Sequence, residues 1–138
     1  MNILITRPLM DAEDLMEKLF AYGHKIIHLP TLKISIVETE LVNSDNFDAF
    51  IFTSTNAVRN LNLTNSSKSL HCFCVGSITE KIARYSGFIN TSSAGGTVNA
   101  LKNLIMISDK VNKNSNLAYF CGDNISSDLD LELRKEGL

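Results

Sequence analysis

The sequence has no excess of basic residues, since its 138 residues include 13 Lys and Arg against 15 Asp and Glu, for a net charge of -2. That balance argues against a dedicated nucleic-acid or membrane-surface binder, which gathers positive charge. No apolar run approaches the roughly 20 residues of a membrane-spanning helix. The apolar start of the chain is too short for a signal peptide, because Arg7 and Pro8 interrupt it. We therefore expect a cytoplasmic protein without a nucleic-acid or membrane partner.

Cysteine is scarce, and the three cysteines are an odd number that does not form a disulfide framework. Cys72 and Cys74 lie two apart and would share one face of a strand. Without a neighbouring Cys or His at zinc spacing, they are more simply small buried residues than metal ligands. The three histidines are scattered on or beside predicted strands, and ordinary surface or half-buried residues are favoured over a general base. They are His24, His28 and His71.

Hydrophobic residues make up 44% of the chain and charged residues 20%, which is typical of a folded globular domain. Short apolar runs alternate with segments whose apolar residues recur at helical spacing. The predicted strands are residues 2–6, 25–29, 32–36, 49–52, 71–75, 88–91 and 117–120. The predicted helices are residues 11–22, 56–63, 77–85, 97–107 and 127–135. This alternation predicts an α/β fold in which a parallel sheet has helices on both faces.

Residues at the predicted helix ends indicate how the helices are capped. Gly23 stands where a left-handed C-terminal cap belongs. Ser77 and Glu80 have the spacing of a capping box, and Ser127 and Asp130 resemble one.

Four predicted strand-to-helix junctions share a polar composition. They are residues 6–8, 53–56, 76–79 and 121–124. In a parallel sheet such junctions lie at the carboxyl edge, where doubly wound folds bind ligands. Their free backbone N–H groups suit carboxylates or phosphates, although capping alone requires the same residue types. The glycine-rich loop at residues 94–97 lacks the spacing and the lysine of a Walker motif, so nucleotide binding is weakly supported.

Several segments, taken in order, have the motifs of one known family. They read ILITRP at 3–8, LPTLKI at 29–34, FDAFIFTSTNAV at 47–58, VGSIT at 75–79, YSGF at 85–88 and FCGDN at 120–124. In their order and spacing they resemble uroporphyrinogen-III synthase, the cyclase of tetrapyrrole biosynthesis. The resemblance covers nearly the whole chain.

The resemblance implies an enzyme of two flavodoxin-like α/β domains, in which the chain starts domain 1, builds domain 2 and returns to complete domain 1. Residues 1–33 would be the first β-α-β segment of domain 1, and residues 34–138 would be domain 2 without its closing strand. We expect an N-terminal portion of the enzyme that is truncated and inactive alone. We also expect it to self-associate or to pair with a separately encoded C-terminal half.

The implied activity is that of a hydro-lyase of haem biosynthesis, which cyclises hydroxymethylbilane to uroporphyrinogen III with inversion of ring D. Loss of the hydroxyl gives an azafulvene, which the substituted carbon of ring D attacks to form a spiro intermediate. No metal or organic cofactor is implied. The substrate carries eight carboxylates, which suits a cleft lined by helix N-termini.

The resemblance also assigns roles to residues of the junctions. Thr79 matches the threonine of the family's Val-Gly-x-x-Thr turn, and Ser54 matches the serine of its Phe-Thr-Ser turn, so both are predicted to be catalytic. The predicted substrate-binding residues are Thr6, Arg7, Thr55, Asn56, Gly76, Gly122 and Asn124.

Two other functions remain open from the sequence. The chain could be a non-catalytic α/β module that binds a small anion at its helix N-termini. It could also be a receiver or flavodoxin-like regulatory domain, although such a domain predicts an acidic pocket where Thr6, Arg7 and Pro8 stand.

Overall fold

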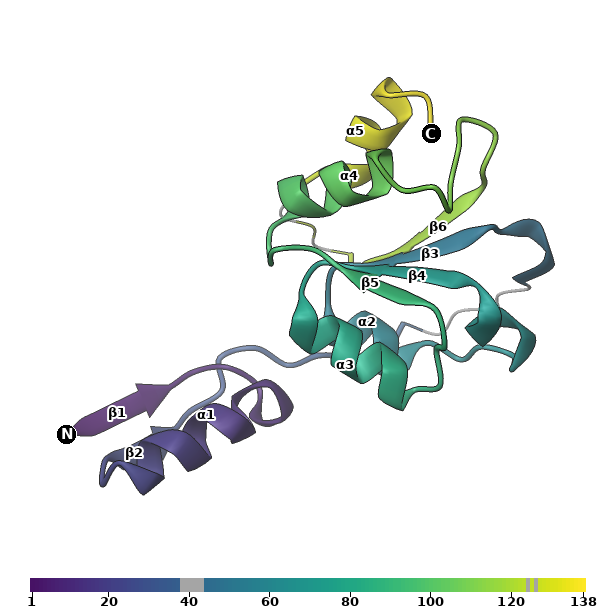
Figure 1. Ribbon diagram of the computed structural model, residues 1–138. Helices are drawn as coiled ribbons and strands as arrows, with labels where there is room; N and C mark the ends of the chain where they lie inside the picture. The colour runs from purple at the N-terminus through teal and green to yellow at the C-terminus, as the bar shows by residue number, and fades with distance from the viewer. Residues whose placement is uncertain (38–43, 124, 126) are drawn as a thin grey trace. The chain divides into compact units, whose positions relative to one another are not determined.

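A computed structural model describes residues 1–37, 44–123, 125 and 127–138 of the chain (Figure 1). The chain divides into two compact units, Met1–Val37 and Glu38–Leu138, and each is described here by itself. None of the described helices has the length and apolar character needed to cross a membrane.

The first unit is a single β-α-β segment. Strands β1 (Asn2–Ile5) and β2 (Lys25–His28) pair in parallel, and helix α1 (Leu9–Ala21) connects them. The helix ends as predicted, because Gly23 has a φ of 77° and the N–H of the next residue, His24, donates to the Leu19 carbonyl at 3.1 Å.

The second unit contains a four-stranded parallel sheet in the order β5-β4-β3-β6. Its strands are β3 (Ala49–Phe52), β4 (His71–Cys74), β5 (Thr91–Ser93) and β6 (Leu117–Phe120). Because β6 follows β5 in the chain but pairs with β3, the chain crosses the sheet before its last strand. Short 3-10 turns, η1 (Ser44–Asn46) and η2 (Ser66–Ser69), precede β3 and β4.

Four helices cover the two faces of this sheet (Figure 1). Helices α2 (Thr55–Asn60) and α3 (Ser77–Tyr85) lie on one face. Helices α4 (Val98–Met106) and α5 (Leu129–Lys135) lie on the other. The predicted α/β fold with helices on both faces is confirmed.

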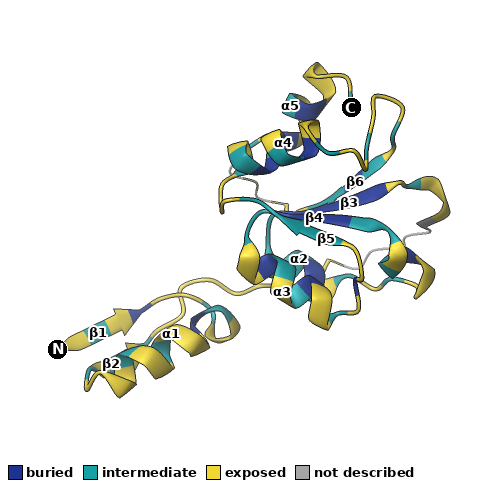
Figure 2. Ribbon diagram, in the orientation of Figure 1, coloured by how far each residue is buried: buried dark blue, intermediate teal, exposed yellow. Residues whose placement is uncertain are grey.

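The core of the second unit is split by the sheet, because successive side chains of a strand point to opposite faces. Central strand β3 is buried along its whole length (Figure 2). Toward α2 and α3 the buried side chains are Phe50, Phe52, Val58, Cys72, Cys74, Ala83, Phe88 and Ala118. Toward α4 and α5 they are Ala49, Ile51, Phe73, Leu101, Ile105, Leu129 and Leu133.

Aromatic rings fill the core layer between the sheet and helices α2 and α3. Phe120 of β6 lies edge-on to Phe50, with ring centroids 5.2 Å apart, and stacks on Phe52 at 5.3 Å. Phe88 also lies edge-on to both β3 rings. Such offset and edge-to-face pairs are the favoured aromatic geometries, so β6 and the segment after α3 both contribute to the packing of β3.

The strand predicted at residues 32–36 is wrong. Residues 31–37 are exposed and form neither helix nor strand. The N–H of Thr31 donates to the Thr6 carbonyl at 3.0 Å, just beyond the ends of β1 and β2. Alternation of apolar and polar residues describes a half-buried strand, but a strand also needs a neighbour that accepts its hydrogen bonds.

The strand predicted at residues 88–91 starts later, at Thr91. Phe88 belongs instead to the end of α3, where its N–H donates to the Ala83 carbonyl at 3.1 Å and Gly87 donates to Arg84 at 3.0 Å. This pair of bonds closes the helix, and the ring of Phe88 enters the core. The helix predicted at 56–63 is also shorter, since α2 ends at Asn60.

Both predicted capping boxes are wrong. The residue that precedes α3 is Gly76, and no side chain caps that helix. Helix α5 starts at Leu129 after Asp128, again without a side-chain cap, and the Asp130 carboxylate pairs with Arg134 at 2.8 Å.

Candidate functional site

The four strands of the second unit are parallel, so the turns that follow them meet at one edge of the sheet, which we call the carboxyl edge. In sheet order these turns are residues 94–97, 75–76, 53–54 and 121–123. Residues that are far apart in the sequence therefore become neighbours along this edge.

Ser54 precedes α2 and caps it. Its Oγ accepts a hydrogen bond from the Asn56 N–H at 3.1 Å. The side chain of Thr55 accepts from Arg59 Nη1 at 3.3 Å, and the Asn56 carbonyl accepts from the Asn60 side chain at 2.9 Å. The N–H of Asn56 is therefore already used within the turn, whereas the Ser54 hydroxyl accepts that bond and can still donate its own proton.

Thr79 is the third residue of α3 and is only 5% exposed. The turn before it packs against the next turn along the edge, where a Cβ placed on Gly76 would lie 3.4 Å from the Gly96 Cα. The Gly96 N–H donates to the Val75 carbonyl at 2.8 Å, and its φ of 92° suits glycine. The glycine-rich loop thus supports the Gly76 turn, and the N–H of Gly96 is not free for a phosphate.

A hydrogen bond at the carboxyl edge went unpredicted. The hydroxyls of Thr53 and Tyr119 lie 3.1 Å apart and are partly buried. They are 66 residues apart in the sequence, and no local motif relates them. The bond joins the end of β3 to β6 and fixes the first residue of the turn that leads to Ser54.

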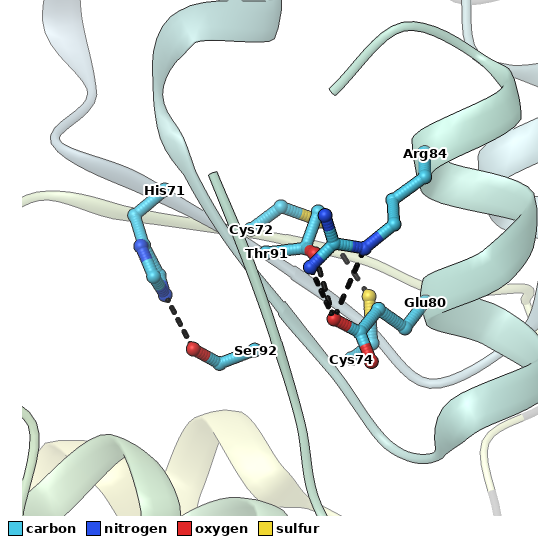
Figure 3. A network of polar contacts seen from close by, with 7 residues as sticks. All are labelled: His71, Cys72, Cys74, Glu80, Arg84, Thr91 and Ser92. Carbon is cyan, nitrogen blue, oxygen red and sulfur yellow. Dashed lines mark hydrogen bonds and ion pairs between the residues drawn. The ribbon is translucent and has the colours of Figure 1, made fainter. Parts of the chain in front are cut away.

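A second unpredicted feature is a network of polar contacts around Glu80, in the first turn of α3 (Figure 3). Its carboxylate accepts from Thr91 Oγ1 at 2.7 Å and from Arg84 Nη2 at 2.9 Å. Hydrogen bonds from Ser93, Thr91 and Arg84 lower the pKa of Glu80 to about 2. We refer to Glu80, Arg84, Thr91 and Ser93 as the Glu80 network.

Cys72 and Cys74 lie beside this network in the core, fully buried, with their sulfurs 3.6 Å apart (Figure 3). The hydrogen bond with Cys74 and burial both raise the pKa of the Cys72 thiol. A raised pKa disfavours the thiolate, which is the reactive and metal-binding form. The prediction of small buried residues is confirmed. Within the described ranges, no group of three or more His, Cys, Asp or Glu residues is arranged to hold a metal ion.

Two histidines, His71 and His28, make side-chain hydrogen bonds. His71 begins β4, at the end opposite the carboxyl edge, and its Nε2 lies 3.0 Å from Ser92 Oγ. Burial, and then the charge of Lys110, lower the pKa of His71. In the first unit, His28 Nε2 lies 2.9 Å from the Arg7 carbonyl.

The structure brings most of the predicted site residues to the carboxyl edge of the second unit. These are Ser54, Thr55, Asn56, Gly76, Thr79 and Gly122. Thr6 and Arg7 are exposed residues of the first unit and follow β1. The prediction for Asn124 lies outside the described residues.

Comparison with known proteins gave one family. A family profile described as uroporphyrinogen-III synthase HemD matches residues 13–138. A comparison with curated proteins found no match. The matched residues include the whole second unit, with every turn of the carboxyl edge. Since the match extends over far more than half of the sequence, the chain belongs to the uroporphyrinogen-III synthase family.

Proposed function

We propose that the chain binds hydroxymethylbilane and takes part in its cyclisation to uroporphyrinogen III. One observation is central to this proposal: the family match extends over all four strand-to-helix turns of a single sheet edge. In this proposal, the first unit belongs to domain 1 of the family's architecture and the second unit to domain 2.

The proposed role of the carboxyl edge is to hold substrate carboxylates. Ser54 can donate its hydroxyl proton to a carboxylate while its oxygen still caps α2. Thr79 lies next to the Gly76 turn, in the first turn of α3, where the helix dipole favours negative charge. The other proposed substrate contacts are Thr6, Arg7, Thr55, Asn56, Gly76, Gly122 and Asn124.

The proposed reaction begins when the hydroxyl of the substrate's hydroxymethyl group leaves as water, so that its methylene carbon becomes the electrophilic carbon of an azafulvene. The substituted carbon of ring D attacks this carbon, and the resulting spiro intermediate fragments and recloses with ring D inverted. Closure without that attack would leave ring D in its original orientation. A protein can therefore direct the outcome by holding a flexible chain in one geometry. An edge touches the substrate from one side, so we expect the isolated chain to bind tetrapyrroles but to direct cyclisation weakly.

Binding is tested by titrating the chain with uroporphyrin III, a stable macrocycle with eight carboxylates, and following its fluorescence. We expect saturable binding that weakens in Ser54→Ala, with Ser127→Ala as a matched serine control. Activity is tested by supplying hydroxymethylbilane enzymatically from porphobilinogen and measuring the type III share of the product. A predominantly type III product from this chain alone would contradict the expected weak activity.

A thermal-shift screen distinguishes the proposal from a module that binds small anions. We expect uroporphyrin III to raise the melting temperature more than inorganic phosphate at equal concentration, since a ligand that binds only the folded state stabilises it. Stabilisation by phosphate without any response to uroporphyrin III would overturn the tetrapyrrole proposal.

A further inference from the structure

The Glu80 network joins a helix to a neighbouring strand. Glu80 follows Thr79 directly in α3, and its partners Thr91 and Ser93 belong to β5. Figure 3 shows the contacts of Glu80 with Thr91 and Arg84. The Glu80 side chain is 19% exposed, so it lies between helix and strand and not in open solvent. Its hydrogen bonds therefore hold the first turn of α3 against β5.

Two turns of the carboxyl edge adjoin the elements that this contact joins, one before α3 and one after β5. Strand β5 continues into Ala94, whose N–H donates to the Cys74 carbonyl at 2.9 Å, and then into Gly96, which bonds to Val75. The backbone thus pairs the turn after β5 with the turn after β4. Glu80 adds a side-chain contact that fixes the helix following that second turn.

The charge of Glu80 presents a difficulty for a site that accepts carboxylates, because like charges repel. Arg84 offsets this charge, since its guanidinium donates two hydrogen bonds to Glu80 Oε1, from Nη2 at 2.9 Å and from Nε at 3.3 Å. An anionic ligand at the start of α3 would then meet a neutral pair instead of a free carboxylate.

We propose that Glu80 is a positioning residue of the carboxyl edge, which holds Thr79 and the Gly76 turn against β5, and that Arg84 shields its charge from an anionic ligand. This inference rests on the proposed function for the identity of the ligand. It assigns Glu80 no contact with the substrate.

Three variants of the full chain separate positioning from shielding, with uroporphyrin III as the probe. Glu80→Ala removes the contact with β5 and is expected to weaken binding at every salt concentration. Glu80→Gln keeps an oxygen that can accept from Thr91 and is expected to bind at least as tightly as the wild type. Arg84→Met leaves the carboxylate unshielded and is expected to weaken binding about two- to fivefold, the range typical of exposed charge pairs.

Salt distinguishes the two effects. Screening shortens from about 10 Å in 0.1 M salt to about 3 Å in 1 M salt, so the loss in Arg84→Met should disappear in concentrated salt. The loss in Glu80→Ala should persist. Lys110→Met is the matched control, since it removes one positive charge from an exposed pair with Asp109, 3.1 Å away, in the segment after α4. Wild-type binding in Glu80→Ala, or equal weakening in Lys110→Met and Arg84→Met, would overturn the inference.

A second measurement needs no ligand. Amide hydrogen exchange of residues 80–83, whose N–H groups donate to the carbonyls of residues 76–79, should accelerate in Glu80→Ala and remain slow in Glu80→Gln, because only the first variant frees the helix from β5. Unchanged exchange in Glu80→Ala would overturn the positioning role whatever the binding result. If the wild type fails to bind uroporphyrin III, the proposed function fails, and the exchange measurement still decides whether Glu80 positions the edge.

Discussion

The two units of this chain use the same β-α-β pattern and bury it very differently. In the second unit, β3 has helices on both faces and is buried throughout. In the first unit, Leu4 and Ile27 face each other across β1 and β2 and are both 56% exposed. An apolar strand is therefore not sufficient to form a core. A parallel sheet needs cover on two faces, and one helix supplies only one.

The largest expected effect comes from a substitution in the buried strand β3 of the second unit. Phe50→Ala should destabilise the second unit by about 3–5 kcal/mol, because it removes a fully buried ring that four other aromatic side chains contact. Leu4→Ala is the control in the first unit and should cost no more than about 0.5 kcal/mol. Urea unfolding followed by circular dichroism measures both, and equal losses would contradict the comparison.

Acid should weaken the second unit through Glu80. Its pKa is lowered from an ordinary 4.5 to about 2, so the folded state binds fewer protons than the unfolded state at intermediate pH. The stabilisation is present above pH 4.5 and disappears as the pH falls through 2. The variant Glu80→Gln should lose less stability than the wild type over this interval. Urea unfolding at several pH values tests this, and parallel pH profiles for the two proteins would contradict it.

The bond between Thr53 and Tyr119 should contribute about 0.5–1.5 kcal/mol to the second unit. Tyr119→Phe and Thr53→Val each remove it, and the double variant should cost less than the sum of the single changes because they share one interaction. Tyr85→Phe is the control, since that ring is 77% exposed. Strict additivity in thermal unfolding would show that the two hydroxyls do not interact.

The smallest effect on stability is expected at the exposed face of the first unit. Leu4→Thr and Ile27→Thr keep residues that favour strands and remove exposed apolar area. We expect the free energy of unfolding to change by no more than about 0.5 kcal/mol and self-association to decrease. Light scattering at several concentrations measures the second effect, and a wild type that remains monomeric throughout would contradict it.

The sequence predicted those parts of the fold that depend on local pattern. Residues 77–85 and 117–120 were predicted with the bounds they have, because their apolar periodicity and their ending residues agree. The strand prediction for residues 32–36 was wrong because alternation of apolar and polar residues does not show whether a partner strand exists. The capping box predicted for Glu80 was wrong because its carboxylate accepts hydrogen bonds from Thr91 and Ser93, which are distant in the sequence.

The candidate site was predictable to the same extent. The polar turns were found because each follows a strand directly, and parallel pairing brings them to one edge. The hydrogen bond between Thr53 and Tyr119 could not be predicted, since it depends on the pairing of β6 with β3. The sequence also did not reveal which backbone N–H groups are already hydrogen-bonded. The N–H of Asn56 donates to the Ser54 side chain, and the N–H of Gly96 donates to the Val75 carbonyl.

The return of β6 to the side of β3 determines the order in which the sheet can be completed. The N–H of Asn116, just before β6, donates to the Asp48 carboxylate, which lies 68 residues earlier in the chain. A ribosome that adds about 5–20 residues per second needs about 3–14 seconds to synthesise that interval. Throughout it, β3 has an open edge, and Phe50 and Phe52 lack the ring of Phe120. Newly made chains therefore expose their most apolar strand for seconds, an interval in which a chaperone, or another nascent chain, can pair with it first.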